Sequence, residues 1–168
     1  MLIIRLFFQP TMTVLDIPKV KQKPNHCGPA CLSMVAQYFG KSLDQEEIAQ
    51  YWGGEEHFKK GGVARQTLVQ CARHHGFIAN SYEGLSLDNV VEFIDRGLPI
   101  IARVQASRRW SHYIVIKGYQ TNPTSLFLND PGSSPYEEQP YEDFVLRWRI
   151  RRKNHASYRY GIVLRPRE

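Results

Sequence analysis

The sequence predicts an α+β fold in which helices come first and an antiparallel β-sheet follows. Up to Gly97, apolar residues recur mainly at three- and four-residue steps, which is typical of amphipathic helices. After Gly97 the chain changes to short β-branched and aromatic runs separated by turn residues, which is typical of hairpin-linked strands. Of its 168 residues, 42% are hydrophobic, so we expect a single globular domain over residues 1–168.

The first two helices are marked by their terminal residues. One begins at about Gly28, since Pro29 suits an initial helical turn, and it ends before Gly40. The motif Ser42-Leu-Asp-Gln45 matches a capping box and predicts that Ser42 caps a second helix running through EEIAQYW. The following stretch, GGEEHFKKGG, is expected to be a charged, Gly-rich loop.

Two more helices and a short strand complete the first part of the chain. A helix is expected over residues 65–74, closed by Gly76, and a strand over residues 78–82. Ser86 is the expected cap of the last of these helices, SLDNVVEFIDRG, which stops at Gly97.

The pattern of the second part of the chain predicts a β-sheet. Strands are expected in LPIIARVQ (98–105), HYIVIKGYQ (112–120), TSLFLNDP (124–131) and YGIVLRP (160–166). A short helix is expected over residues 141–148, with an apolar face made by its two aromatic residues Phe144 and Trp148.

The amino-terminal stretch is a poor match to a signal peptide. MLIIRLFF is apolar but short, is interrupted by Arg5 and lacks a small-residue cleavage site. We expect residues 1–11 to form a first strand or to lie upstream of a true start at Met12. No apolar run approaches the ~20 residues that a membrane-spanning helix needs, so a cytoplasmic location is expected.

The net charge of +6 is concentrated in RWRIRRKNHASYRY, residues 147–160. A solvated basic segment anchored by aromatic residues is one interpretation, and a contact surface for an acidic peptide is another. Interleaved basic and aromatic residues also occur in nucleic-acid-binding proteins, but no nucleic-acid-binding motif accompanies them here. We therefore expect no nucleic-acid partner.

The chain has three cysteines, Cys27, Cys31 and Cys71, and an odd number argues against a disulfide framework. Cys27 and Cys31 share one helical face, but no further ligands follow at a spacing typical of zinc sites. Neither a metal nor any other cofactor is expected.

Cys27 lies where the first helix begins, directly before Gly28. Unpaired N–H groups and the helix dipole favour an anion at this position, so the site suits a thiolate nucleophile. Cys31 is one turn deeper on the apolar face and is expected to pack. A cysteine at a helix start can equally be structural, so the catalytic hypothesis requires partners.

His112 is the best candidate for a general base among the six histidines. It opens an apolar strand immediately after the polar loop ASRRWS, which gives it a rigid backbone and an open side. His26, next to Cys27, is expected to point away. Asp130 ends the next strand, eighteen residues later, and an antiparallel hairpin would bring it beside His112. Its carboxylate would then accept a hydrogen bond from the imidazole Nδ1–H.

Two neighbours of these residues complete the prediction. Gln22, five residues before Cys27, can place its side-chain amide beside the Cys27 N–H as an oxyanion donor. Asn129 is next to Asp130, but alternation along a strand sends it to the opposite face.

Taken together, these motifs resemble the bacteriocin-processing, double-glycine leader peptidases, which are papain-like cysteine peptidases. The similarity extends from Val20 to Pro131. The motifs that carry it are QKPNHCGPACLSMVAQYFG, KGGVARQTLVQCARHHGF, GLPIIARV, SHYIVIKGYQ and FLNDPG.

The resemblance implies that Cys27 is the nucleophile, His112 the acid and base, Asp130 the orienting residue and Gln22 the oxyanion donor. It also implies cleavage after Gly-Gly, in a tight cleft for which Trp110 is a candidate wall. Two features differ from the pattern. Transporter-type members often place the glutamine six residues before the cysteine, and they are fused to ABC transporters, whereas this chain has neither membrane segments nor an ATPase motif.

Three alternatives stay open at this level. The same thioester chemistry can transfer an acyl group to an amine instead of water. A catalytically silent module could use the cleft to bind a peptide. A nucleic-acid-binding protein would use residues 147–160 and lose affinity steeply with salt.

Overall fold

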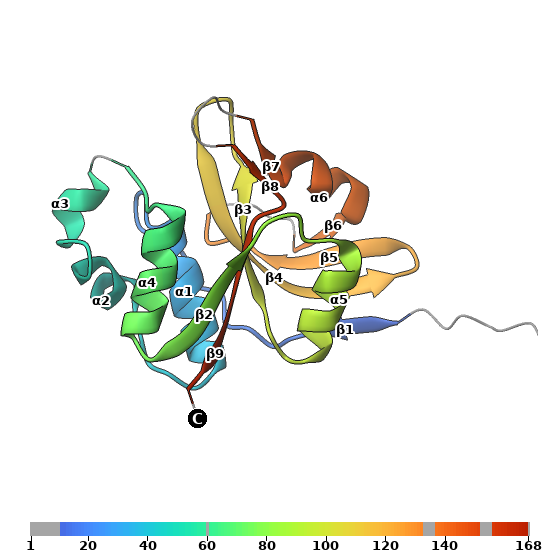
Figure 1. Ribbon diagram of the computed structural model, residues 1–168, viewed down its shortest axis with the longest axis horizontal. Helices are drawn as coiled ribbons and strands as arrows, with labels where there is room; N and C mark the ends of the chain where they lie inside the picture. The colour runs from blue at the N-terminus through green and yellow to red at the C-terminus, as the bar shows by residue number, and fades with distance from the viewer. Residues whose placement is uncertain (1–10, 60, 133–136, 152–155, 168) are drawn as a thin grey trace, which may run out of the picture.

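The computed structural model describes residues 11–59, 61–132, 137–151 and 156–167 (Figure 1). Its helices are α1 (Cys27–Tyr38), α2 (Gln45–Gln50), α3 (Glu55–Phe58), α4 (Arg65–His74), α5 (Leu87–Asp95) and α6 (Tyr141–Arg147). Its strands are β1 (Met12–Val14), β2 (Phe77–Tyr82), β3 (Ile100–Gln105), β4 (Ser111–Thr121), β5 (Thr124–Asn129), β6 (Glu138–Pro140), β7 (Arg149–Ile150), β8 (Ser157–Tyr158) and β9 (Gly161–Pro166). The α+β class predicted from the sequence is confirmed.

An antiparallel sheet forms the centre of the fold. Its strands are ordered β2-β9-β3-β4-β5-β6, and β1 pairs with the part of β4 that lies toward its carboxyl end. The strands β7 and β8 form a separate two-stranded ribbon. Figure 1 shows α1, α2 and α4 on one side of the sheet and α5 and α6 on the other side.

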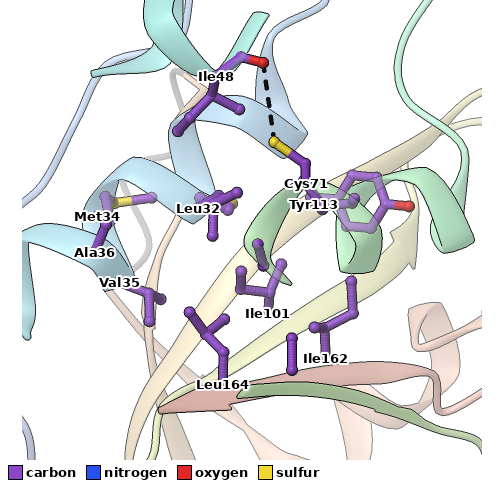
Figure 2. Packing of buried hydrophobic residues seen from close by; sticks show 14 of the residues in the cluster. Leu32, Met34, Val35, Ala36, Ile48, Cys71, Ile101, Tyr113, Ile162 and Leu164 are labelled. Carbon is purple, nitrogen blue, oxygen red and sulfur yellow. Dashed lines mark hydrogen bonds between the residues drawn. The ribbon is translucent and has the colours of Figure 1, made fainter. Parts of the chain in front are cut away.

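The alternation of side chains along β4 divides the core into two clusters. Tyr113 and Val115 face α1 and α4, where they join a cluster that includes Cys31, Leu32 and Ile101 (Figure 2). Ile114 and Ile116 point to the other face and pack in a cluster with residues of α5, α6 and β5. Both clusters are almost fully buried, so β4 is covered on both faces and cannot shift register without exposing one of them.

Most of the elements expected from the sequence are present. The helix ends predicted at Gly40, Gly76 and Gly97 all have positive φ values of 76°, 83° and 71°, which a glycine adopts without strain. Ser86 caps α5 by accepting a hydrogen bond from the Asn89 N–H at 3.2 Å.

Three expectations need correction. The cap of α2 is Asp44 rather than Ser42, and it forms a capping box with Glu47. The stretch expected to be entirely loop contains the helical turn α3. The strand β1 was not predicted, because a run of three residues is too short for its pattern to indicate a strand. The expectation for residues 1–10 lies outside the described residues.

β1 approaches β4 so closely that β4 must carry a glycine there. The register between β4 and β5 shifts between Ile116 and Gly118. A Cβ atom on Gly118 would lie 2.5 Å from the Thr13 carbonyl oxygen and 2.9 Å from the Cα of Val14. Since both of these are backbone atoms, they can move away only if the strand itself moves.

We therefore expect Gly118→Ala to destabilise the protein by about 1–3 kcal/mol, the usual cost of overpacking. Gly62→Ala is the matched control, because the nearest atom to its Cβ would be the Asn25 carbonyl oxygen at 3.6 Å. Urea denaturation of both variants gives the free energies of unfolding. Equal stability of the two variants would contradict the close approach of β1.

Candidate active site

Cys27 is the first residue of α1 and is partly exposed, whereas the residues that follow it up to Ala36 are buried. The turn before it is tight: Asn25 has a φ of 62°, and its side chain donates a hydrogen bond to the Phe58 carbonyl at 2.8 Å. No acidic side chain lies in the first helical turn. The thiol is therefore held where the helix N–H groups favour a negative charge.

His26 faces away from the thiol, as predicted. Its ring is buried, stacks on Phe58 at a centroid distance of 4.1 Å, and places Nδ1 2.6 Å from the Pro24 carbonyl oxygen. His26 therefore shapes the turn before α1 and is not placed to act as the base.

The β4–β5 hairpin brings His112 and Asp130 together. The Nε2 atom of His112 lies 2.6 Å from Oδ1 of Asp130, with side-chain exposures of 18% and 8%. The proximity predicted from the spacing of the two strands is confirmed. Asn129 is turned elsewhere and donates its side-chain N–H to the Ile17 carbonyl at 2.8 Å.

The nitrogen used is not the one expected. The sequence analysis assigned Nδ1–H to the carboxylate, but the contact is made by Nε2. The Cys27 side chain also acts on His112, since its hydrogen bonding and negative charge contribute to the raised pKa of the imidazole. With Nε2 engaged by Asp130, Nδ1 is the ring nitrogen that remains for another partner.

The charges around His112 favour its protonated form. Burial alone lowers the pKa of the imidazole, but the hydrogen bonds and negative charges of Asp130 and Cys27 raise it to about 9. For Asp130 the sign is opposite: burial raises its pKa, and the bonds and charge of His112 outweigh burial and lower it. The pair therefore exists as imidazolium and carboxylate at neutral pH.

Two further groups hold the carboxylate. The Gly132 N–H donates to Asp130 Oδ1 at 2.8 Å, and a Cβ at Gly132 would lie 3.1 Å from the same oxygen. The positive charge of Arg147, at the end of α6, also lowers the pKa of Asp130. Gly132 belongs to the motif FLNDPG and Arg147 opens the basic segment 147–160, but nothing in the sequence predicted that either residue acts on Asp130.

Gln22 lies in the segment that leads to Cys27. Its backbone N–H donates to the Pro131 carbonyl at 2.8 Å, which ties this segment to the residue that follows Asp130. Its side-chain Oε1 is buried and has no hydrogen-bond partner among the described residues. Gln22 is thus held close to the chain segment that carries the carboxylate.

Gln45 fixes the Gln22 segment from the other side. Its Oε1 accepts from the Lys23 N–H at 2.9 Å, and its Nε2 donates to the Lys21 carbonyl at 3.0 Å. The sequence analysis placed Gln45 in a capping box, whereas its buried side chain clamps the residues on both sides of Gln22. A contact across 23 residues leaves no local signal in the sequence.

The other two cysteines, Cys31 and Cys71, are buried and their thiols are hard to ionise. Burial raises the pKa of Cys31 well above its ordinary value and raises that of Cys71 to about 12. A packing role was predicted for Cys31, and both cysteines belong to the first cluster, where Figure 2 labels Cys71. Among the described residues, no group of three or more His, Cys, Asp and Glu side chains is arranged to hold a metal ion.

Comparison with known proteins supplies the family. A sequence profile described as the Peptidase_C39 like family matches residues 14–156, a range that includes Gln22, Cys27, His112 and Asp130. The chain belongs to this family. It is accordingly a cysteine-type peptidase, as the resemblance of its motifs predicted.

Three relatives illustrate the similarity. The chain is 22% identical over 111 residues to LagD of Lactococcus lactis subsp. lactis, a lactococcin-G-processing and transport ATP-binding protein. The aligned region covers 66% of this chain but 15% of LagD. The peptidase domain of Streptococcus ComA, a bi-functional ABC transporter, superposes with a TM-score of 0.69 at 24% identity, covering 89% of this chain and 98% of that domain.

The third is a double glycine motif protease from an AMS/PCAT transporter, solved with its leader peptide. It superposes with a TM-score of 0.62 at 19% identity and covers 92% of this chain and 95% of the other. At these identities both superpositions establish the fold. In the described part of this chain, no helix has the length and apolarity that crossing a membrane requires.

The raised pKa of His112 predicts how stability depends on pH. Because the folded-state value of about 9 exceeds the ordinary 6.5, the stabilisation by the imidazolium is complete below pH 6.5 and is lost as pH rises through 9. We expect a contribution on the order of 1–3 kcal/mol, at about 1.4 kcal/mol for each pKa unit.

Urea denaturation between pH 6 and pH 10 measures this effect as the difference in unfolding free energy between the native chain and His112→Gln. That difference should shrink over the range from 6.5 to 9. His57→Gln, in the exposed turn of α3, is the control and should give a flat difference. A flat difference for His112→Gln would rule out the ion pair.

Proposed function

We propose that this chain hydrolyses peptide bonds after a Gly-Gly pair in a peptide substrate, with Cys27, His112 and Asp130 as its catalytic triad and Gln22 as an oxyanion donor. The observation that supports the proposal most directly is the 2.6 Å contact between His112 Nε2 and Asp130 Oδ1 next to a cysteine at a helix start. The coupling of His112 to Cys27 supports the same assignment.

The proposed reaction follows from this arrangement. The Cys27 thiolate attacks the carbonyl carbon of the scissile bond, and the negative charge that develops on the oxygen is stabilised by the Cys27 N–H and the Gln22 side-chain amide. The His112 imidazolium gives its proton to the leaving amine, and the C–N bond breaks to leave a thioester on Cys27. Water, deprotonated by His112, then hydrolyses the thioester and restores the thiolate–imidazolium pair.

Asp130 acts through the histidine. By accepting the Nε2–H bond it fixes the ring so that Nδ1 faces the sulfur, and it stabilises the imidazolium. Gly132 and Arg147 in turn keep Asp130 ionised. The role proposed for each of these residues therefore rests on electrostatics that favour a charged pair.

The substrate class is inferred from the relatives. The name of LagD describes the processing of a bacteriocin, and the third relative is a double glycine motif protease crystallised with a leader peptide. Since this chain spans 15% of LagD, only the peptidase reaction, and none of the transport, is carried over. We propose that the partner is a peptide whose leader ends in Gly-Gly.

Cleavage of a synthetic peptide containing an internal Gly-Gly tests the proposal. We expect Cys27→Ala to reduce kcat/KM to the background and Gln22→Ala to reduce it roughly 10²–10³-fold, the usual cost of losing one oxyanion donor. Gln37→Ala, on the exposed face at the far end of α1, is the matched control and should leave kcat/KM unchanged.

Mass spectrometry of the released fragment identifies the reaction, because hydrolysis yields a free carboxylate, whereas transfer to an added amine yields an amide. Cleavage that persists in Cys27→Ala would refute the assignment of the nucleophile.

Alkylation by iodoacetamide tests the thiol without a substrate. At pH 6–7 we expect Cys27 to react at least tenfold faster than Cys31 and Cys71, because it is partly exposed while burial raises the pKa of the other two. His112→Ala should remove most of this advantage, since the imidazolium that stabilises the thiolate is lost. Peptide mass mapping after timed quenching gives the three rates, and equal rates would contradict the proposed pair.

A further inference from the structure

A basic cavity lies beside the proposed catalytic residues. It has a volume of about 590 Å³, is open to solvent and is lined by Gln105, Arg108, Leu146, Arg149 and Arg151. These residues come from the end of β3, the β3–β4 loop, α6 and β7. Figure 1 shows that the β3–β4 hairpin rises next to the α6–β7 segment, so the cavity is formed between two parts of the chain that are distant in sequence.

Both walls of the cavity are formed by chain segments that adjoin the proposed triad. On one wall, Gln105 of β3 pairs with Ser111 of β4, the residue immediately before His112. On the other wall, Leu146 precedes Arg147, whose charge acts on Asp130. These two adjacencies make the cavity a candidate contact for a peptide that is bound at Cys27.

The charge of the lining is one-sided. Three of the five lining side chains are guanidinium groups, and none is a carboxylate. Among the described residues, no ion pair involves Arg108 or Arg151, while Arg149 lies over the Tyr158 ring at 5.4 Å. Glu83 lines a neighbouring cavity together with Arg149 and Arg151, and its carboxylate binds Arg65 and the Tyr158 N–H.

Apolar side chains accompany the arginines. Leu146, in the lining, is 71% exposed, and Trp110, on the same loop as Arg108, is 65% exposed. A surface that exposes large apolar groups between cations suits a ligand that has both carboxylates and an apolar side chain, because the carboxylates pair with the cations and the apolar groups contact one another. Among the described residues the lining itself has no aromatic ring and the adjoining loop has one, Trp110, whereas single-stranded nucleic acids are held by successive bases that stack on aromatic rings.

We propose that this cavity binds an acidic segment of the peptide substrate, with carboxylates on Arg108, Arg149 and Arg151 and one apolar side chain on Leu146. The inference rests on the proposed function in one respect, which is that the bound acidic segment belongs to the peptide that is cleaved. Binding of an acidic peptide does not require the chemistry at Cys27, so the two proposals can fail separately.

Fluorescence anisotropy on the Cys27→Ala protein measures binding without cleavage. The probes are a fluorescein-labelled peptide in which Glu residues surround a single Leu, the same peptide with Gln for Glu, and an oligothymidylate of similar length. We expect the Glu peptide to bind at least tenfold more tightly than the Gln peptide at low salt. Arg108→Gln combined with Arg151→Gln should remove roughly this tenfold difference.

Arg165→Gln is the matched control, because Arg165 is an exposed arginine of β9 that does not line the cavity. It should leave the affinity for the Glu peptide unchanged. Equal affinity for the Glu and Gln peptides, or an equal loss in Arg165→Gln, would overturn the proposal. Tighter binding of the oligothymidylate, lost in the double variant, would overturn it in favour of a nucleic-acid site.

Cleavage assays with native Cys27 separate this inference from the proposed function. The substrates are Gly-Gly peptides that carry either the Glu or the Gln segment next to the cleavage site. We expect Arg108→Gln combined with Arg151→Gln to lower kcat/KM for the acidic peptide about tenfold. It should leave kcat/KM for the neutral peptide unchanged. If neither peptide is cleaved but the Glu peptide still binds selectively, the proposed function fails and the basic cavity stands.

Discussion

The pairing of β4 with β5 is the constraint on which the rest of the structure depends. Buried side chains on both faces of β4 lock its register, because a slip by one residue would exchange the two clusters. The same register sets Asp130, just beyond β5, opposite the start of β4, where His112 lies. The free energy that holds the core together thus also holds the histidine and the carboxylate at hydrogen-bonding distance.

Around this hairpin, the segments that carry chemistry are fixed by hydrogen bonds between loops. Gln45 clamps the residues on both sides of Gln22, and the Gln22 N–H is bound to Pro131, next to Asp130. Gly132 and Arg147 complete the surroundings of the carboxylate. Because these bonds are satisfied inside the fold, the polar groups of the site are positioned before any substrate arrives, which is the condition for electrostatic catalysis.

The same frame places the thiols of α1 in different surroundings. One turn of α1 takes the chain from Cys27, partly exposed at the helix start, to Cys31, completely buried in the core. The β3–β4 loop and the β7 segment contribute Arg108, Arg149 and Arg151 to one cavity, while Asp130 places a negative charge beside His112. The fold thus brings together three arginines that lie apart in a chain of net charge +6.

The sequence by itself determined the order of the elements, the helix ends at glycines, and the residues Cys27, His112, Asp130 and Gln22 as candidates. These features are local: periodicity, caps and turn residues act within a few positions, and the His112–Asp130 contact follows from a short hairpin. Only the tertiary structure decided that Asp44 caps α2 while Gln45 clamps a distant loop, that Nε2 rather than Nδ1 meets Asp130, and that the charge of Arg147 acts on the carboxylate. Each of these depends on side-chain direction and on contacts between distant segments, which core packing sets and no short motif encodes.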